Sequence, residues 1–442
     1  MEKAYETYKD SGLNYLGDIP SHWKTVKLKY IGEAITGITY SPNDVIDNEN
    51  GLLVLRSSNI QGGKLSLDNN VYVSKEIKEK YLTKIGDILL CSRNGSRNLI
   101  GKNILIDEKV ANETWGAFMT IYRTQHSKFA YYFFNSPIFD ALSSLFLSST
   151  INQLTIGVIN NFILALPPKQ EQTQIAAYLD YHTQLIDTLI SKKETLIQKL
   201  QEQRQAIINE AVTKGLNKNA ALKESGIEWL GEIPEHWEVV KLSHYSEVIG
   251  GSTPRSNVDE YWEGDISWVT TDDLGKVKNK TINQSRRTIT EKGLSSCSAS
   301  LVPENSLIIS CRAPIGHLAI NKMPTATNQG CKSIVPKEFY ITDYLYYFFV
   351  TAKKDLQSLG TGSTFIEIST SDLKNYKVLK PSIKEQNEIV SYLDVKMLKL
   401  DLVFEEITKS IQKLKAYRQS LISEAVTGKI DVRDWQHPKN KS

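Results

Sequence analysis

The chain lacks the sequence features of zinc-binding, secreted and membrane-spanning proteins. Its only four cysteines, Cys91, Cys297, Cys311 and Cys331, show neither CxxC nor Cys/His spacing, which argues against a zinc module and a disulfide framework. No run of about 18 apolar residues occurs, and residues 1–10 lack the apolar segment of a signal peptide. We therefore expect a reduced, cytoplasmic protein that does not contact a membrane.

The chain also has little excess of either charge. Its 53 Lys and Arg residues nearly balance its 50 Asp and Glu residues, which leaves a net charge of +3. Bulk attraction cannot support tight binding to nucleic acid at this balance, so any basic surface must be local. Hydrophobic residues make up 40% of the 442 residues, a globular composition with room for two or three domains.

No segment carries a complete catalytic motif. Residues 95–103 (GSRNLIGKN) resemble a phosphate-binding loop, but Asn103 stands where a Ser or Thr would bind magnesium, and the spacing of the glycines is one residue too long. Pro167-Pro168 lacks the preceding Asn and the following aromatic residue of an adenine methyltransferase. We expect no catalytic residue, no metal site and no cofactor in this chain.

An internal repeat organises the chain. Residues 11–28 (SGLNYLGDIPSHWKTVKL) and 225–242 (SGIEWLGEIPEHWEVVKL) are identical at 11 of 18 positions, at an offset of 214. The same offset aligns the EQ, YLD and EAVT segments of the two copies, at 171–172, 178–180 and 210–213 and at 385–386, 392–394 and 424–427. Between these blocks, residues 29–165 and 243–380 look largely unrelated. The chain is therefore two copies of one plan: a short leading segment, a divergent body and a shared helical end.

The His-Trp pairs of the two leading segments, His22-Trp23 and His236-Trp237, predict a packed junction. We expect each indole to be buried and each His to bond to the backbone.

Apolar residues at three- and four-residue spacing predict a long helix at the end of each copy. The predicted seam comprises Ile175, Leu179, Ile186, Leu189, Leu196 and Leu200 in the first helix, and Ile389, Leu393, Leu400, Ile407 and Leu414 in the second. Prolines precede both helices, and Gly215 and Gly428 should end them. A helix of about 43 residues is about 65 Å long and needs a partner. We favour antiparallel pairing of the two helices over separate helical hairpins inside larger cores.

Short apolar runs predict strands inside both bodies, at 52–55, 87–90, 104–106, 266–269 and 307–309. The aromatic segments 129–134 and 344–349 should begin amphipathic helices that pack on these sheets. The predicted fold class is α+β: two small mixed α/β domains joined by two long antiparallel coiled-coil helices, with a pseudo-twofold internal repeat. We place the boundaries at 1–168 (first domain), 169–216 (first helix), 217–382 (second domain), 383–430 (second helix) and 431–442 (tail).

Polar loops at the ends of the predicted strands hold the candidate DNA-binding residues. Their side chains are the types that bond to base edges and phosphates, although each loop alone could simply be solvated. In the first body the candidates are Arg56, Ser57, Asn59, Arg93, Asn94, Ser96, Arg97 and Asn98, with Asn152 and Gln153 from the loop 148–153. In the second body they are Ser252, Thr253, Arg255, Thr270, Thr271, Asp272, Arg312, Asn328, Gln329 and Lys332. Arg93 and Arg312 both follow a hydrophobic strand and a nearby cysteine, so we expect related roles for them.

The doubled L-G-[DE]-I-P-x-H-W block, the E-Q-x-x-I-x-x-Y-L-D helix start and the E-A-V-T helix end resemble the specificity subunit of type I restriction-modification systems. The resemblance covers almost the whole chain, and residues 250–274 and 326–336 are similar to that family's target recognition domains. It implies that each body reads one half of a bipartite, asymmetric target in double-stranded DNA. It further implies two methyltransferase (M) subunits and restriction/motor (R) subunits as partners, which would carry S-adenosylmethionine and ATP with Mg.

Two other hypotheses remain open at this point. One is a self-contained DNA methyltransferase or nuclease with divergent motifs, which predicts activity of the purified chain without partners. The other is a coiled-coil scaffold without a role in DNA binding. A scaffold is disfavoured because it needs no pair of unlike bodies on nearly identical frames.

Overall fold

The structure is a computed structural model that describes residues 3–47, 51–146, 152–360 and 367–438. It divides into two compact units, Met1–Lys193 with Thr408–Ser442 and Glu194–Ile407. Positions 148–151 of the predicted polar loop lie outside the described residues. No helix among the described residues is both long enough and apolar enough to span a bilayer.

The body of the first unit is built on two four-stranded sheets. One has the order β11-β10-β13-β4 with antiparallel neighbours, and the other has the order β12-β6-β9-β5 with a parallel β12–β6 pair. The strands are β1 (Tyr8–Asp10), β2 (Asp18–Pro20), β3 (Lys24–Lys27), β4 (Gly32–Thr36), β5 (Val45–Ile46), β6 (Leu52–Leu55), β7 (Ile60–Gln61), β8 (Lys64–Leu65), β9 (Tyr72–Val73), β10 (Ile88–Cys91), β11 (Asn103–Leu105), β12 (Thr114–Trp115), β13 (Met119–Thr124) and β14 (Ile163–Leu166). The helices are α1 (Ser127–Phe134), α2 (Pro137–Ser144) and α3 (Ile156–Asn161).

The body of the second unit has a five-stranded sheet of order β18-β25-β22-β23-β20 and a three-stranded sheet of order β21-β19-β24. The strands are β15 (Leu222–Glu224), β16 (Glu232–Pro234), β17 (Glu238–Lys241), β18 (Ser246–Gly250), β19 (Trp262–Val269), β20 (Thr281–Ile282), β21 (Arg287–Ile289), β22 (Leu307–Ser310), β23 (Leu318–Asn321), β24 (Thr325–Thr327), β25 (Cys331–Pro336) and β26 (Lys377–Lys380). The helices are α5 (Leu242–Tyr245), α6 (Thr271–Lys276), α7 (Glu291–Ser295), α8 (Thr342–Thr351), α9 (Lys353–Leu359) and α10 (Thr370–Asn375).

The two bodies share one backbone plan although their sequences look unrelated. The antiparallel order β4-β13-β10-β11 of the first body recurs as β18-β25-β22-β23 in the second, and the parallel pair β6–β12 recurs as β19–β24. Main-chain hydrogen bonds form these ladders, so the pairing can persist while side chains change. The divergence expected from the sequence therefore lies in side chains and loops rather than in the topology of the bodies.

The predicted strands and aromatic helices are present in both bodies. The aromatic segments lie in α1 and α8, where Phe133, Phe134, Phe348 and Phe349 are buried in the core.

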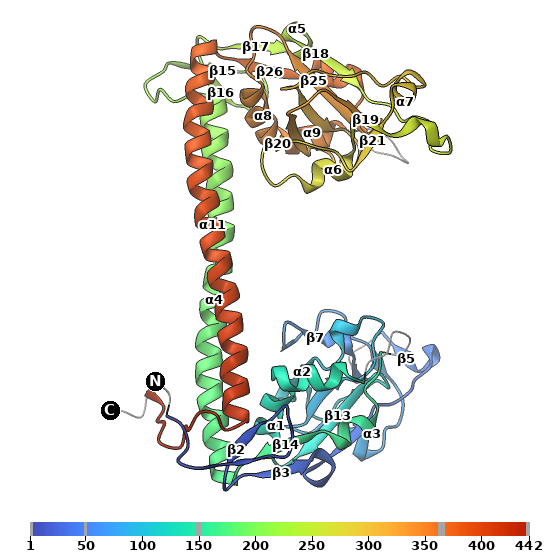
Figure 1. The fold of residues 1–442 in the computed structure, drawn as a ribbon, viewed down its shortest axis with the longest axis vertical. Coiled ribbons are helices and arrows are strands. Elements are labelled where there is room, and N and C mark those ends of the chain that lie inside the picture. Colours follow the sequence, from blue (N-terminus) through green and yellow to red (C-terminus); the bar gives the residue numbers. More distant parts are fainter. Residues whose placement is uncertain (1–2, 48–50, 147–151, 361–366, 439–442) are drawn as a thin grey trace. The chain divides into compact units, whose positions relative to one another are not determined.

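Each copy ends in one long helix, as the sequence predicts. Helix α4 (Lys169–Lys214) has 46 residues and α11 (Ile383–Val426) has 44 residues, so each is about 66–69 Å long at 1.5 Å per residue. The predicted terminal glycines are confirmed, because Gly215 and Gly428 adopt φ of 72° and 71°, the left-handed conformation that ends helices. Both helices pass from one unit into the other, and they lie side by side (Figure 1).

Two ion pairs show that α4 and α11 are antiparallel. In the first unit Arg418 donates to Asp187 at 2.9 Å, and in the second unit Arg204 donates to Asp401 at 2.5 Å. The two acidic residues are related by the repeat offset, as are the two arginines. The same ion pair therefore recurs in each unit, at positions related by the repeat of the sequence.

The seam between the helices differs from the predicted one at two positions. Leu189 and Leu196 are 48% and 44% exposed, whereas the neighbouring Ile190 is 8% exposed and Ile197 is half-buried. In each of these two adjacent apolar pairs, the prediction assigned the leucine to the seam, but the isoleucine is the more buried residue. The spacing along one helix fits either residue, and the register of the partner helix decides which one faces inward. The other predicted seam residues are buried or half-buried: Ile175, Leu179, Ile186, Leu200, Ile389, Leu393, Leu400, Ile407 and Leu414.

The repeated motifs join each body to the start of its helix. In the first copy Glu171 accepts a hydrogen bond from Trp23 Nε1 at 3.0 Å and lies 2.9 Å from His22 Nε2. Each Trp is fully buried as predicted, but the expected backbone partner of each His was wrong: the His bonds to the Glu of the EQ motif. The motif supplies a carboxylate that binds both ring N–H groups at once.

The second copy repeats this joint. Glu385 accepts from Trp237 Nε1 at 3.1 Å and lies 2.7 Å from His236 Nε2, and Ser382 donates to it as well. Burial opposes ionisation of this carboxyl, but the bonds from His236, Trp237 and Ser382 lower the pKa of Glu385 to about 2.

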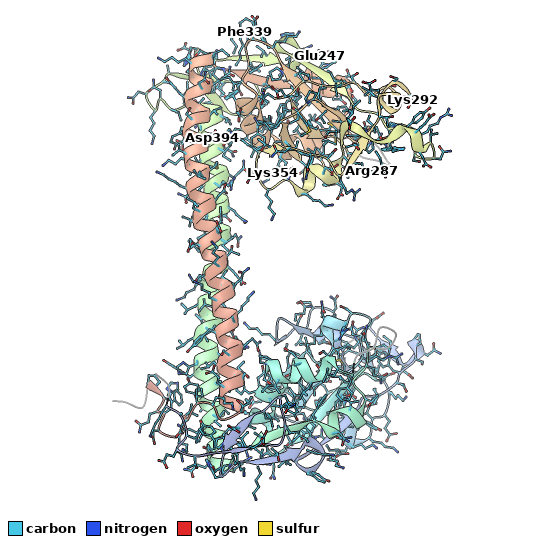
Figure 2. The ribbon with its side chains drawn as sticks, viewed as in Figure 1. Glu247, Arg287, Lys292, Phe339, Lys354 and Asp394 are labelled. Atoms are coloured by element: carbon cyan, nitrogen blue, oxygen red, sulfur yellow. The ribbon has the colours of Figure 1, made fainter. Side chains whose placement is uncertain are left out.

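The Asp of the YLD motif forms a second joint. Asp180 accepts a hydrogen bond from the Tyr132 hydroxyl at 2.7 Å, and Asp394, labelled in Figure 2, accepts one from Tyr347 at 2.6 Å. These tyrosines belong to the aromatic helices α1 and α8. The motif therefore locks the aromatic helix of each body onto its long helix.

Candidate nucleic-acid interface

The loops of the second body that the sequence singles out converge at one end of its main sheet. Gly251 N donates to Cys331 O, and Ser252 N donates to Thr327 O, which ties the end of β18 to the start of β25. A Cβ added at Gly330 would lie 3.0 Å from Thr271 Cγ2, 3.4 Å from Asn328 Oδ1 and 3.8 Å from Arg312 Cβ. A glycine here lets the loops meet.

Two tryptophans fix the first of these loops. Trp268 Nε1 donates to Ser252 O at 3.0 Å, and Trp262 Nε1 donates to Arg255 O at 3.1 Å. The Arg287 guanidinium, labelled in Figure 2, lies 3.7 Å from the ring centroid of Trp262. The two indole N–H groups hold the backbone carbonyl groups of the loop. The side chains of Thr253 and Arg255 are exposed to solvent.

The neighbouring loops are also braced by their own side chains. Thr253 Oγ1 bonds to Gln329 Oε1 across two loops. Thr270 and Asp273 form a capping box at the start of α6, which orients Thr271 and the exposed Asp272. Asp272 accepts from Lys276 at 2.7 Å, so its negative charge is matched locally.

Arg312 lies beside the loop that carries Gly330 and is held by an acidic side chain. Its Nε donates to Glu367 Oε2 at 2.7 Å, and Lys332 Nζ donates to Glu367 Oε1 at 3.2 Å. Arg312 is 40% exposed, whereas Lys332 is buried. Burial opposes ionisation of the carboxyl, but the bonds from the two cations hold the pKa of Glu367 below its usual range.

The loops of the first body are joined by amide side chains. Asn94 Nδ2 donates to Ser57 Oγ at 3.0 Å, and its Oδ1 accepts from Ser96 N at 3.0 Å. Asn152 Nδ2 donates to Gly95 O at 3.2 Å. These bonds bring together three loops that the sequence predicted only as separate candidates.

Arginines and one exposed aromatic side chain line this part of the first body. The Arg93 guanidinium lies 5.0 Å from the ring centroid of Phe118, which is 57% exposed. Arg97 donates to Ser144 O at 3.0 Å, and Asn98 is exposed beside it. A hollow of about 730 Å³ opens here, lined by Tyr40, Arg56, Ser57, Arg93 and Phe118 among others. The arrangement offers guanidinium groups beside an aromatic face, a combination that suits nucleic acid.

Arg93 and Arg312 occupy the same position in the two bodies. The backbone N–H of each donates to the carbonyl of the residue just before the neighbouring strand of the sheet, Phe118 O before β13 at 3.0 Å and Gly330 O before β25 at 3.3 Å. Each also forms an isolated β-bridge, with Gln153 and with Glu367 respectively. The neighbouring cysteines are not equivalent, because Cys91 precedes Arg93 by two positions and Cys311 precedes Arg312 directly.

Two predicted candidates lie inside the protein. Asn59 is 1% exposed, and its amide bonds to Arg56 N, Ser66 O and Asn70 Oδ1. Lys332 is buried against Glu367. Both polar groups are bonded within the fold, Asn59 to Arg56 N and Lys332 to the carboxylate that holds Arg312, and their contact with DNA stays a prediction.

Sequence reasoning missed Phe118 and Glu367. No local pattern marks Phe118, since its exposure depends on the start of β13. Glu367 could have been found from the sequence, because the repeat offset of 214 that aligns the helices makes it the equivalent of Gln153. Within the described ranges no group of three or more His, Cys, Asp or Glu residues could hold a metal ion.

Two bodies of one plan, each with arginine-bearing loops at a sheet end and each joined to the start of a long helix, define a duplicated recognition protein. The sequence profile of the type I restriction modification DNA specificity domain matches residues 20–199 and again 234–413. The chain therefore belongs to the family of type I restriction-modification DNA specificity subunits.

Individual relatives and solved structures agree with this assignment. The chain is 23% identical to the EcoKI specificity subunit of Escherichia coli K12, over 94% of this chain and 91% of that one. It is 42% identical to the MjaIX specificity subunit of Methanocaldococcus jannaschii over 166 residues, which span 37% of this chain and 38% of that relative. A chain solved in work on assembly and conformational transition of the type I R-M system has a TM-score of 0.73 at 16% identity and covers 93% of this chain and 99% of that one. The HsdS subunit of Thermoanaerobacter tengcongensis has a TM-score of 0.53 at 16% identity, with 93% and 98% covered.

Proposed function

We propose that this chain reads DNA sequence for a type I restriction-modification complex, with each body recognising one half of a bipartite, asymmetric target. The observation that carries the proposal is the duplicated arginine position. Arg93 and Arg312 lie on one backbone plan, each among polar loops at a sheet end, while the surrounding side chains differ. Such a pair can read two different sequences from equivalent places.

The chemistry of modification and cleavage then belongs to partner subunits. Two methyltransferase subunits would bring S-adenosylmethionine, and restriction or motor subunits would bring ATP and Mg. The contribution of this chain is non-catalytic: it selects the site and positions the partners, and it acts in the cytoplasm where the complex meets DNA. The net charge of +3 supports little nonspecific attraction, so DNA binding by the isolated chain should be weak.

The test exchanges residues 29–165 for the corresponding body of another family member and maps methylation by the assembled complex. We expect one half of the target to change and the other half to persist. A simultaneous change in both halves would contradict the division into two readers. Methyl transfer or cleavage by the homogeneous chain alone would instead favour a self-contained enzyme.

A further inference from the structure

The position opposite the duplicated arginine differs between the two bodies. In the first body the β-bridge pairs Arg93 with Gln153, and in the second it pairs Arg312 with Glu367. The residue that follows the bridge partner is held by a main-chain hydrogen bond in both bodies: Leu154 N donates to Ser92 O at 2.8 Å, and Ile368 N donates to Cys311 O at 2.9 Å. The backbone therefore brings a variable side chain to the same arginine in both copies.

In the second body this side chain orients the guanidinium. Glu367 engages Arg312 through Nε, and its second oxygen is occupied by Lys332. Among the described residues, no hydrogen bond reaches the two terminal amino groups of Arg312, and the side chain is 40% exposed. A guanidinium held by one edge presents the remaining N–H groups as a rigid fork.

The first body holds its arginine differently. Arg93 is exposed, and the contact that positions its guanidinium is the face of Phe118 at 5.0 Å. A guanidinium stacked on a ring face can still rotate within its own plane. A hydrogen-bonded carboxylate restricts this rotation more strictly. Glycine replaces that aromatic residue in the second body, at Gly330, where a large side chain would meet Thr271 and Arg312.

We propose that Glu367 is a positioning residue that sets the base preference of the second body, by holding Arg312 so that its terminal amino groups bond to a guanine. This inference rests on the proposed function. Guanine presents O6 and N7 in the major groove as two acceptors at the spacing of a guanidinium fork, and no other base offers that pair. Glu367 itself repels phosphates, so its role is selection rather than attraction.

The experiment uses the complex assembled with its methyltransferase subunits, after methylation mapping has identified the target. Affinities are measured at one fixed salt concentration for duplexes in which each base pair of the target is replaced in turn, and for unrelated DNA. In the wild-type complex, one G·C pair in the half-site of the second body should be strongly preferred, and Arg312→Ala should abolish that preference.

Glu367→Ala should reduce the preference at this same pair by at most roughly 10- to 100-fold, the discrimination that one complete bidentate contact supplies, because Arg312 itself remains. Binding to unrelated DNA should stay equal or become tighter, because the variant loses a negative charge. Glu367→Gln should retain more of the preference than Glu367→Ala, since its carbonyl can still accept from Nε. A residue that serves only folding would weaken all duplexes alike.

Two further variants keep the test decisive. Glu247→Ala removes an exposed carboxylate from β18, so it matches the charge change and should leave every base preference intact. Glu367→Ala with Lys332→Met removes both members of the Lys332–Glu367 pair, which avoids an unpaired buried ammonium at position 332 and should still lose the preference. An unchanged preference at every position in a folded Glu367 variant would overturn the inference. A wild-type complex that binds all duplexes alike would refute the proposed function itself.

Discussion

Lengthening the helix pair should widen the gap between the two half-sites without changing either half. Both helices run from one unit into the other, and ion pairs Asp187–Arg418 and Arg204–Asp401 fix their register. We would duplicate residues 189–192 (LISK) in α4 and their equivalents 403–406 (VFEE) in α11. Both duplications fall between the two ion pairs, so each pair can still form.

The magnitude follows from helix geometry. Four residues lengthen a helix by about 6 Å, and stacked base pairs repeat at about 3.4 Å, so the preferred gap should grow by one or two base pairs. An insertion of four residues into a heptad pattern is a stutter, which locally unwinds the coil while the seam continues. The duplicated segments each carry a seam residue, Ile190 or Phe404, so the inserted turn also has a side chain to bury.

A single duplication in α4 is the matched control. With α11 unchanged, the two ion pairs would be out of step by about 6 Å. Each partly exposed pair contributes about 1 kcal/mol or less, so the larger penalty comes from the mismatched seam. We expect this variant to loop out the insertion, or to lose activity. The assay is methylation by the assembled complex on targets that differ only in gap length. An active double-duplication variant that keeps the original gap would show that these helices do not set the spacing.

Three further predictions follow from side chains whose contacts are known. Arg93→Ala should weaken binding to target DNA by about 1–3 kcal/mol if the arginine reads a base, and Phe118→Ala by a smaller amount of about 0.5–1 kcal/mol; unchanged titrations of both folded variants would assign Arg93 to structure. Glu385→Gln should remove an acid-dependent contribution to stability: the folded pKa of about 2 lies below the ordinary 4.5, so the contribution is present above pH 4.5 and is lost toward pH 2. The difference in Tm between wild type and variant should therefore shrink over that range, and a constant difference would contradict the assignment. Trp23→Ala removes a fully buried indole and should cost about 3–5 kcal/mol in unfolding free energy, as should Trp237→Ala in the second unit; denaturant melts with near-wild-type midpoints would show that these joints are dispensable.

The elements predicted best from the sequence are those whose signal is local and repeated. The long helices were predicted from apolar spacing, flanking prolines and terminal glycines, all of which are readable along the chain. The seam failed at Leu189 and Leu196 because two adjacent apolar residues fit the same spacing, and the choice between them depends on the opposite helix. Many strands of two or three residues were missed because so short a segment carries too little periodic signal, whether its partner is near, as for β7 and β8, or distant, as for β12 with its partner β6.

The candidate site shows the same division. Polar residue types at strand ends identified most of the loops that converge in each body. The burial of Asn59 and Lys332 could not be predicted, because the sequence alone does not show whether a polar side chain points to solvent or into the fold. The sequence analysis related Arg93 to Arg312 partly through their neighbouring cysteines, and this reason was wrong. The main-chain hydrogen bonds make the two arginines equivalent, but they leave the two cysteines one position apart.

The distribution of repeated and divergent residues has a physical reason. The residues that recur at the repeat offset are those that join parts: the His-Trp pair with its Glu, and the Asp of YLD. A Tyr hydroxyl bonds to this Asp in both copies too, from Tyr132 and Tyr347, which are 215 positions apart instead of 214. Losing one partner of such a joint strands a buried polar group, so these positions tolerate little change.

The candidate recognition residues are different, because main-chain bonds place their backbone. The backbones of Arg93 and Arg312 are positioned by their own N–H groups and by bridges to Gln153 and Glu367, and these main-chain bonds do not depend on the side chains. The side chains around the arginine can therefore be exchanged without dismantling the sheet that presents it. A frame of this kind separates stability from recognition, which allows one fold to hold two unlike recognition surfaces in a single chain.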